Sequence, residues 1–206
     1  MVDWINSASR RIPPWLIYLV APVPVAWFLY LGFTGGLGVE PIRALEHKLG
    51  ELALQILLVV LAITPLRRFA GVNLLRFRRA LALVCFFYVV LHLLVWLVLD
   101  VQIPAQIWAD IVKRPYITVG MVAFALMIPL ALTSNNLSVR RLGKRWRKLH
   151  LLTYPAVVLG ALHFVLLRKG FQIEPLLYLG AAVLLLALRV KTRRLGRLRT
   201  PGGARG

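Results

Sequence analysis

The stretch that decides the fold is GKRWRKLHLLTYPAVVLGALH, residues 143–163. It starts as a basic segment and continues as an apolar run, a pattern typical of a helix that enters a membrane from the cytoplasm. It carries two of the chain's four histidines, His150 and His163, which lie thirteen residues apart. A histidine inside a membrane span is costly to bury and is by default a candidate functional residue. Two of them on one span predict a stack of cofactors across the membrane.

The composition predicts a membrane protein. The chain has 206 residues, is 60% hydrophobic and has a mean hydropathy of +0.77, whereas soluble domains are about 45–50% apolar. Apolar runs of about 18 residues recur, long enough to cross a bilayer core. Pro22 and Pro24 interrupt the first run and no small-residue cleavage site follows it, so no cleaved signal peptide is expected. The single cysteine, Cys85, is predicted to be a small core residue.

The fold class predicted is all-α, a single domain over residues 1–206 built as an integral membrane bundle of six transmembrane helices. The predicted spans are about residues 14–31, 48–66, 80–99, 115–132, 149–167 and 175–188. Segments 32–46, 100–114 and 133–148 are predicted as loops, with a short turn at 168–174 and a basic tail at 189–206.

The charge of the chain sorts by side of the membrane. The formal net charge is +19. Of the Lys and Arg residues, 20 fall in the termini and in the loops after spans two and four, and 6 fall in the opposite loops. Cytoplasmic loops are enriched in Lys and Arg, so both termini are predicted to be cytoplasmic. Charge is therefore explained by topology rather than by nucleic-acid binding.

Two histidines are predicted to face each other in the outer half of the membrane. His92 lies in span three and His163 in span five, and both spans run from the cytoplasm outward. Two neutral imidazoles from facing helices can supply both axial ligands of a haem iron. The alternative for each histidine is an interhelical hydrogen bond.

A second site is predicted towards the cytoplasm, at His150. The residue at matching depth in span three is Arg78, fourteen positions before His92. On a straight helix, Arg78 and His92 share a face, whereas His150 and His163 are about 140° out of register. A kink at Pro155 could turn His150 inward. The alternative for Arg78 is that it is an ordinary arginine on the cytoplasmic side.

Polar residues also occur in or beside span two. His47 is predicted just outside the span, as an interfacial residue or as a contact for a partner or a quinone. Glu51 and Gln55, four residues apart, are predicted to line one inward face of that helix. Both a proton path and an interhelical polar contact remain open for this pair.

At this point the chain resembles a known family. The 14- and 13-residue spacings are similar to those of the ferric reductase-like transmembrane domain, which holds two stacked b-type haems. More closely, the chain resembles the haem-binding membrane subunits of the bacterial periplasmic methionine sulfoxide reductase system, the MsrQ family. The stretches that carry this resemblance are GGLGVEP (35–41), ITPLRR (63–68), RRALALVCFFYVVLHL (78–93), KRPYITVG (113–120), LGKRWRKLHLLTY (142–154) and PLLYLGAAVLLLALR (175–189).

The resemblance implies roles for four residues. His92 and His163 match the ligands of the outer haem, and His150 matches the inner histidine of span five. Arg78 stands where the wider domain has its other inner histidine, which leaves one or two haems b open. As a permanent cation, Arg78 could instead pair with a haem propionate or a flavin phosphate. The family is also associated with flavin mononucleotide (FMN), for which this sequence has no phosphate-cradling glycine motif.

The function implied is transmembrane electron transfer in the bacterial inner membrane. The acceptor implied is a periplasmic molybdenum-containing methionine sulfoxide reductase, which repairs oxidised periplasmic proteins. The donor implied is quinol or a cytoplasmic flavin reductase. The chain has no dinucleotide-binding fingerprint of its own, so it is expected to receive its electrons from another molecule. The chain is thus expected to be a subunit of an oxidoreductase system rather than its catalytic subunit. The alternatives are a stand-alone ferric or quinone reductase and a haem-free transporter or assembly factor.

Overall fold

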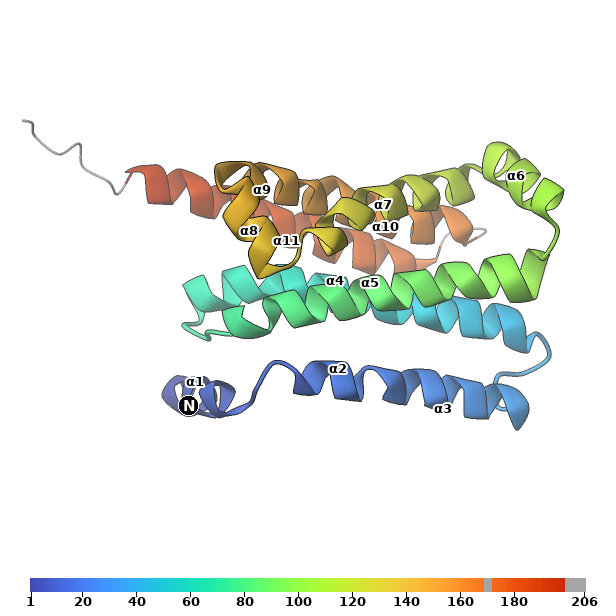
Figure 1. Cartoon of the computed structure of the whole chain (residues 1–206), viewed down its shortest axis with the longest axis horizontal. Helices are drawn as coiled ribbons and strands as arrows, with labels where there is room; N and C mark the ends of the chain where they lie inside the picture. The colour runs from blue at the N-terminus through green and yellow to red at the C-terminus, as the bar shows by residue number, and fades with distance from the viewer. Residues whose placement is uncertain (169–171, 199–206) are drawn as a thin grey trace, which may run out of the picture.

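The computed structural model describes residues 1–168 and 172–198, with side chains up to Arg189, and every regular element in these ranges is a helix (Figure 1). In chain order the elements are α1 (Val2–Arg11), α2 (Leu16–Val20), α3 (Pro22–Phe33), α4 (Pro41–Phe69), the 3₁₀ turn η1 (Leu75–Phe77), α5 (Arg78–Leu94), the π-helical η2 (Val95–Val101), α6 (Pro104–Lys113), α7 (Pro115–Leu132), α8 (Asn136–Leu142), α9 (Lys144–Leu149), the 3₁₀ turn η3 (His150–Leu152), α10 (Thr153–Leu167) and α11 (Ile173–Leu198).

Within the described residues, five helical segments are long and apolar enough to cross a membrane: Leu16–Phe33, Pro41–Phe69, Leu75–Val101, Pro115–Leu132 and Lys144–Leu167. The sixth predicted span, 175–188, lies within α11. The predicted all-α membrane bundle is confirmed. The predicted tail from residue 189 begins as part of the same helix, up to Leu198.

Helix α4 is the centre of the bundle, packed against α3, α5, α10 and α11, while α7 packs on α10 (Figure 1). Small side chains at these contacts let the helices approach closely. Ala53 of α4, Ala161 of α10 and Ala182 of α11 are all buried. Cys85 of α5 is also buried and its Sγ donates to the Ala53 carbonyl at 3.2 Å, as expected for a core residue.

The first span is broken rather than continuous. Pro22 and Pro24 lack the N–H groups that a helix needs, and α2 ends at Val20. The Tyr88 hydroxyl of α5 donates to the carbonyl of Ala21, at the break, at 2.5 Å. The Tyr88 side chain thus ties α5 to the junction between α2 and α3.

The predicted loop at 32–46 is too long. Helix α4 begins at Pro41, because proline is pre-organised for the first helical position and loses no hydrogen bond there. His47 therefore lies inside α4 rather than in a loop.

The predicted loops at 100–114 and 133–148 are mostly helical. Pro104 opens α6 in the same way as Pro41 opens α4. In the second segment the Asn135 side chain accepts a hydrogen bond from the Ser138 N–H and caps α8. Hydropathy does not reveal these short helices because they are not apolar throughout.

The two ends of the bundle differ in composition. The end that carries α1, α8, α9, the α4–α5 connection and the last turns of α11 holds the Arg- and Lys-rich segments, and we call it the basic end (Figure 1). The opposite end carries α6 and the α3–α4 connection, and we call it the α6 end. Residues 169–171 of the predicted turn and 199–206 of the predicted tail lie outside the described residues.

Candidate functional site

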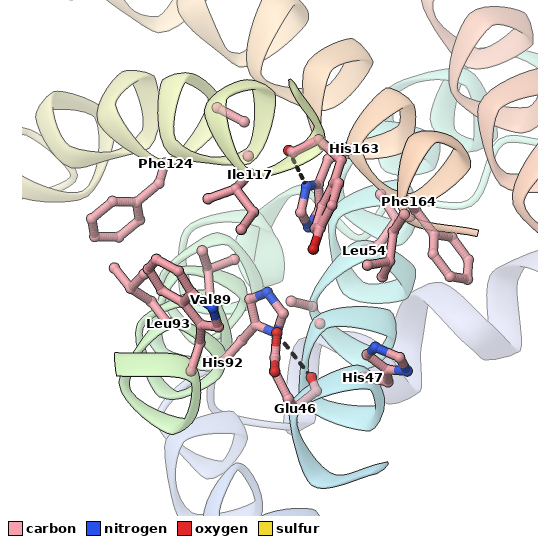
Figure 2. A pocket seen from close by; sticks show the side chains of 18 of the residues that line it. Glu46, His47, Leu54, Val89, His92, Leu93, Ile117, Phe124, His163 and Phe164 are labelled. Carbon is pink, nitrogen blue, oxygen red and sulfur yellow. Dashed lines mark hydrogen bonds between the residues drawn. The ribbon is translucent and has the colours of Figure 1, made fainter. Parts of the chain in front are cut away.

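His92 of α5 and His163 of α10 point towards each other across a cavity (Figure 2). Their ring centroids are 6.2 Å apart and the ring planes are inclined at 75°. Both residues come from the half of the bundle nearer the α6 end. The structure thus brings together the two histidines predicted to share one depth.

Each of these imidazoles is held by a backbone carbonyl. His92 Nδ1 lies 2.8 Å from the Glu46 carbonyl oxygen, and His163 Nδ1 lies 2.6 Å from that of Tyr116. A carbonyl can only accept, so each Nδ1 carries the proton and donates it. The Nε2 of each ring is then left with its lone pair, which is the tautomer that a metal requires.

A glycine lies beside each ring. A Cβ built on Gly50 would stand 3.0 Å from His92 Nδ1, and one built on Gly120 would stand 2.8 Å from His163 Nδ1. Each glycine comes four positions after the residue whose carbonyl accepts the hydrogen bond, on α4 in one case and on α7 in the other. Each ring therefore lies close to the backbone of a neighbouring helix, where a side chain in place of the glycine would displace it.

The cavity between the rings has a volume of about 700 Å³. Most of its wall is apolar, and the members that line it from five helices include Leu54, Leu57, Val89, Leu93, Trp96, Ile117, Phe124, Met127, Ala156 and Phe164. Towards the α6 end it is charged, with Arg43, Glu46, His47, Asp100, Arg114 and Arg168. A volume and lining of this kind suit a large, mostly apolar cofactor that has an anionic edge.

The spacing of the rings fits one iron between them. With metal–nitrogen bonds of about 2 Å, two imidazoles on opposite sides of one iron have ring centres roughly 6 Å apart. The 6.2 Å separation of His92 and His163 agrees with this value. The free Nε2 atoms and the apolar wall agree with it too, so these residues fit a haem.

Two arginines at the charged edge differ in their hydrogen-bond partners. Arg114 donates to the Tyr116 hydroxyl at 3.3 Å and its Nε forms an ion pair with Asp110 at 3.1 Å. The hydrogen bond with Tyr116 is the largest of the effects that raise the pKa of Arg114 above its ordinary value. Arg168 lies with its guanidinium 5.5 Å from the Phe164 ring centroid, and its buried Nε has no hydrogen-bond partner among the described residues. A buried donor of this kind calls for an anionic or carbonyl partner.

The second predicted site lies near the basic end. His150 is in η3, its ring is stacked on Trp146 at 3.8 Å between centroids, and its Nε2 lies 3.1 Å from the Thr133 hydroxyl. Arg78 is half-buried at the start of α5 and is close enough to act electrostatically on His150. The structure therefore places these two residues in one region, with the His150 ring engaged by Trp146 and Thr133.

Sequence reasoning missed four residues of the outer site: Glu46, Gly50, Tyr116 and Gly120. Their role lies in backbone, through a carbonyl or through the absence of a Cβ, and backbone roles leave little trace in residue type. The one available signal is the repeated four-residue spacing to a glycine. His47, placed outside the span by the sequence, lies in α4 and lines the cavity.

Comparison with known proteins gives one consistent result. Residues 49–161 match the family model described as "Ferric reductase like transmembrane component". A protein of Agrobacterium fabrum named "Protein-methionine-sulfoxide reductase heme-binding subunit MsrQ" is 49% identical over 188 residues, which cover 89% of this chain and 87% of that protein. The protein of the same name from Brucella anthropi is 46% identical over 177 residues, covering 85% and 80%.

No solved structure matches the chain. The similarity to both relatives nonetheless extends over most of each sequence, and the family model spans more than half of this one. The chain therefore belongs to the MsrQ family of haem-binding subunits, within the ferric reductase-like transmembrane components.

Proposed function

We propose that this chain carries electrons across the bacterial inner membrane to a periplasmic methionine sulfoxide reductase. The observation that supports this most is the pair of facing imidazoles, each with Nδ1–H given to a carbonyl and Nε2 free. The names of the relatives supply the system in which such a subunit would work.

His92 and His163 would hold a haem b through their Nε2 atoms. When bound, that group supplies reversible one-electron chemistry at the iron. The task of the chain is to fix the two rings, keep water away with the apolar wall and set the depth of the site. The carbonyls of Glu46 and Tyr116 hold the rings in the tautomer that binds iron.

Arg168 is the proposed partner of a haem propionate. Its Nε is buried without a hydrogen-bond partner in the part of the chain that the structure describes, at the charged edge of the cavity. Guanidinium and carboxylate form strong, charge-assisted hydrogen bonds. Arg114, already paired with Asp110 and Tyr116, would add positive potential at the same edge.

The basic end is proposed to face the cytoplasm and the α6 end the periplasm. The 20-to-6 distribution of Lys and Arg supports this orientation. It puts the haem near the periplasmic catalytic subunit, the proposed acceptor. The donor is a quinol or a cytoplasmic flavin reductase.

The inner site remains a prediction. Arg78 and His150 would hold a second haem, or Arg78 would bind a propionate or flavin phosphate there. His150 would have to exchange its contact with Thr133 for a bond to iron. An FMN likewise remains a prediction of the family resemblance.

The test is spectroscopic. The detergent-purified chain should show a Soret band, sharp α and β bands on reduction, and haem b in a pyridine haemochrome assay. After stoichiometric reduction with dithionite, adding the catalytic subunit together with methionine sulfoxide should reoxidise the haem. The same addition with unoxidised methionine is the control and should leave it reduced. A colourless protein would contradict the proposal and favour a haem-free transporter. A haem that stays reduced after the catalytic subunit and methionine sulfoxide are added would favour a stand-alone reductase.

A further inference from the structure

A polar cluster joins two membrane helices near the middle of the bundle. Gln55 Nε2 of α4 donates to the Tyr178 hydroxyl of α11 at 2.7 Å and to Glu51 Oε1 at 2.9 Å. The Tyr178 hydroxyl donates to the same Glu51 oxygen at 3.2 Å. We call Glu51, Gln55 and Tyr178 the α4–α11 triad.

The triad lies where membrane lipid would surround the protein. Gln55 is the central residue of α4 and is exposed, so the inward face predicted for Glu51 and Gln55 is wrong for Gln55. One turn further along the same face, Val59 is 50% exposed, as expected for a side chain that meets lipid. Polar and ionisable groups at this depth are costly and usually functional.

An interhelical contact alone leaves part of the triad unexplained. One hydrogen bond between Gln55 and Tyr178 would join the two helices. Here a carboxylate is added, and neither Glu51 Oε2 nor Gln55 Oε1 has a hydrogen-bond partner among the described residues. The triad thus offers two open acceptors and one hydroxyl that can reorient.

The triad also adjoins the haem cavity. Glu51 lines the cavity between Gly50 and Leu54. Tyr178 packs edge-on against Phe164, with centroids 5.6 Å apart, and Phe164 lines the cavity next to His163. A ring bound at the triad would therefore lie against a side chain that forms part of the cavity wall.

We propose that the α4–α11 triad is the site at which a lipid-soluble quinol binds and is oxidised. The hydroxyl groups of a quinol would donate to Glu51 Oε2 and Gln55 Oε1. The Tyr178 hydroxyl would donate to a carbonyl of the quinone product. This site deepens the proposed function and rests on it, because the electrons need the haem iron as their acceptor.

The proposed reaction balances in protons and electrons. Oxidation of one quinol breaks two O–H bonds and releases two protons and two electrons. A bound haem would take up one electron at a time, so one quinol would require two successive transfers, with the acceptor protein removing the first electron before the second arrives. Glu51 accepts each proton in turn, and His47, one turn away on α4 and lining the same cavity, passes it towards the α6 end.

The experiment uses the full haem-loaded chain in quinone-free lipid nanodiscs, with decylubiquinone and decylubiquinol as probes. Tyr178→Phe, Gln55→Leu and Glu51→Gln are compared with wild type. The matched control is Tyr30→Phe, which removes a hydroxyl from a 57% exposed tyrosine of α3, away from the triad. Binding of decylubiquinone is measured by titration calorimetry, and haem reduction by stopped-flow absorbance.

The triad variants should bind decylubiquinone about tenfold more weakly, as expected for loss of one hydrogen bond to the ligand. Decylubiquinol should reduce the haem of these variants at least about tenfold more slowly than that of wild type. Dithionite should give the same reduced spectrum in all of them. Tyr30→Phe should match wild type in all three.

The outcomes separate the two proposals. If wild-type haem is reduced by quinol and the triad variants react like Tyr30→Phe, the triad is not the site, and the quinol donor stands. If wild type binds no decylubiquinone, the triad proposal is overturned, and the haem assignment is unaffected. Because binding is measured without any redox change, a protein that lacks haem would refute the electron-transfer function and still report on the triad.

Discussion

Gly120 of α7 lies so close to His163 of α10 that a Cβ on the glycine would stand 2.8 Å from Nδ1. Gly50 of α4 stands in the same relation to His92, at 3.0 Å. Each proposed iron ligand is therefore set by a helix other than its own, through a carbonyl and a missing side chain. The position of the rings depends on how α4 and α7 pack against α5 and α10.

Substitution of Gly120 by alanine should displace the His163 ring. The Cβ would overlap Nδ1, and overpacking of this kind costs about 1–3 kcal/mol. The low-spin haem spectrum of Gly120→Ala should broaden or shift in electron paramagnetic resonance, and the haem content should fall. Gly50→Ala should act in the same direction with a smaller effect. Gly180→Ala in α11 is the control, since a Cβ there meets nothing within 4 Å and Gly180 does not line the cavity. An unperturbed spectrum for Gly120→Ala would show that the ring is not set by this contact.

Removing either proposed ligand should remove the same spectral component. His92→Ala and His163→Ala should each abolish the outer low-spin haem, because one imidazole cannot complete a bis-histidine site. His47→Ala is the control, since His47 lines the cavity outside the facing pair. Low-temperature absorption and paramagnetic resonance spectra would check this. A full bis-histidine signal in either ligand variant would rule out the pair.

Arg168→Leu should loosen the haem without changing its ligands. The variant deletes the buried donor proposed to meet a propionate, and a hydrogen bond to a charged group is worth about 1.5–3 kcal/mol. Transfer of haem to apomyoglobin should become at least about tenfold faster, with the ferrous band positions unchanged. Arg140→Leu, in exposed α8 at the basic end, should behave as wild type. Equal transfer rates for both variants would refute the role of Arg168.

The inner site is tested at Arg78. Arginine stays protonated in proteins, so it is an anion partner rather than an iron ligand. Arg78→Ala should lower cofactor retention or slow the entry of electrons and leave the bands of the outer haem in place. Arg78→His should raise the ratio of haem to protein if His150 can leave Thr133 and reach iron. If Arg78→Ala equals wild type in both measurements, the arginine serves only the charge distribution of the basic end.

The orientation of the bundle can be tested with single cysteines. The native Cys85 is buried and should not react in the folded protein. Val39→Cys, in the fully exposed α3–α4 connection, should be labelled by a membrane-impermeant maleimide added to intact spheroplasts. Arg140→Cys should be labelled only after the membrane is opened. The reverse pattern would place the basic end in the periplasm.

Much of the architecture follows from the sequence alone. Apolar runs of span length and the sorting of arginines predict a six-helix bundle, because lipid accepts only backbone that bonds within its own helix. The predicted span 115–132 coincides with α7. The helical spacing of His92 and His163 also predicts their depth, since rise per residue is a local property.

Only the tertiary structure decides how each helix is rotated about its axis and which side chains and carbonyls of other helices it meets. A hydropathy run does not say which way a helix face points, so the 6.2 Å approach of the two rings needed the packing of α4, α5, α7 and α10. The roles of the Glu46 and Tyr116 carbonyls are invisible to residue type because every residue has a carbonyl. The same holds for the triad, in which Glu51 and Gln55 share a helix face in the sequence, and Tyr178 joins them only because α11 packs against α4.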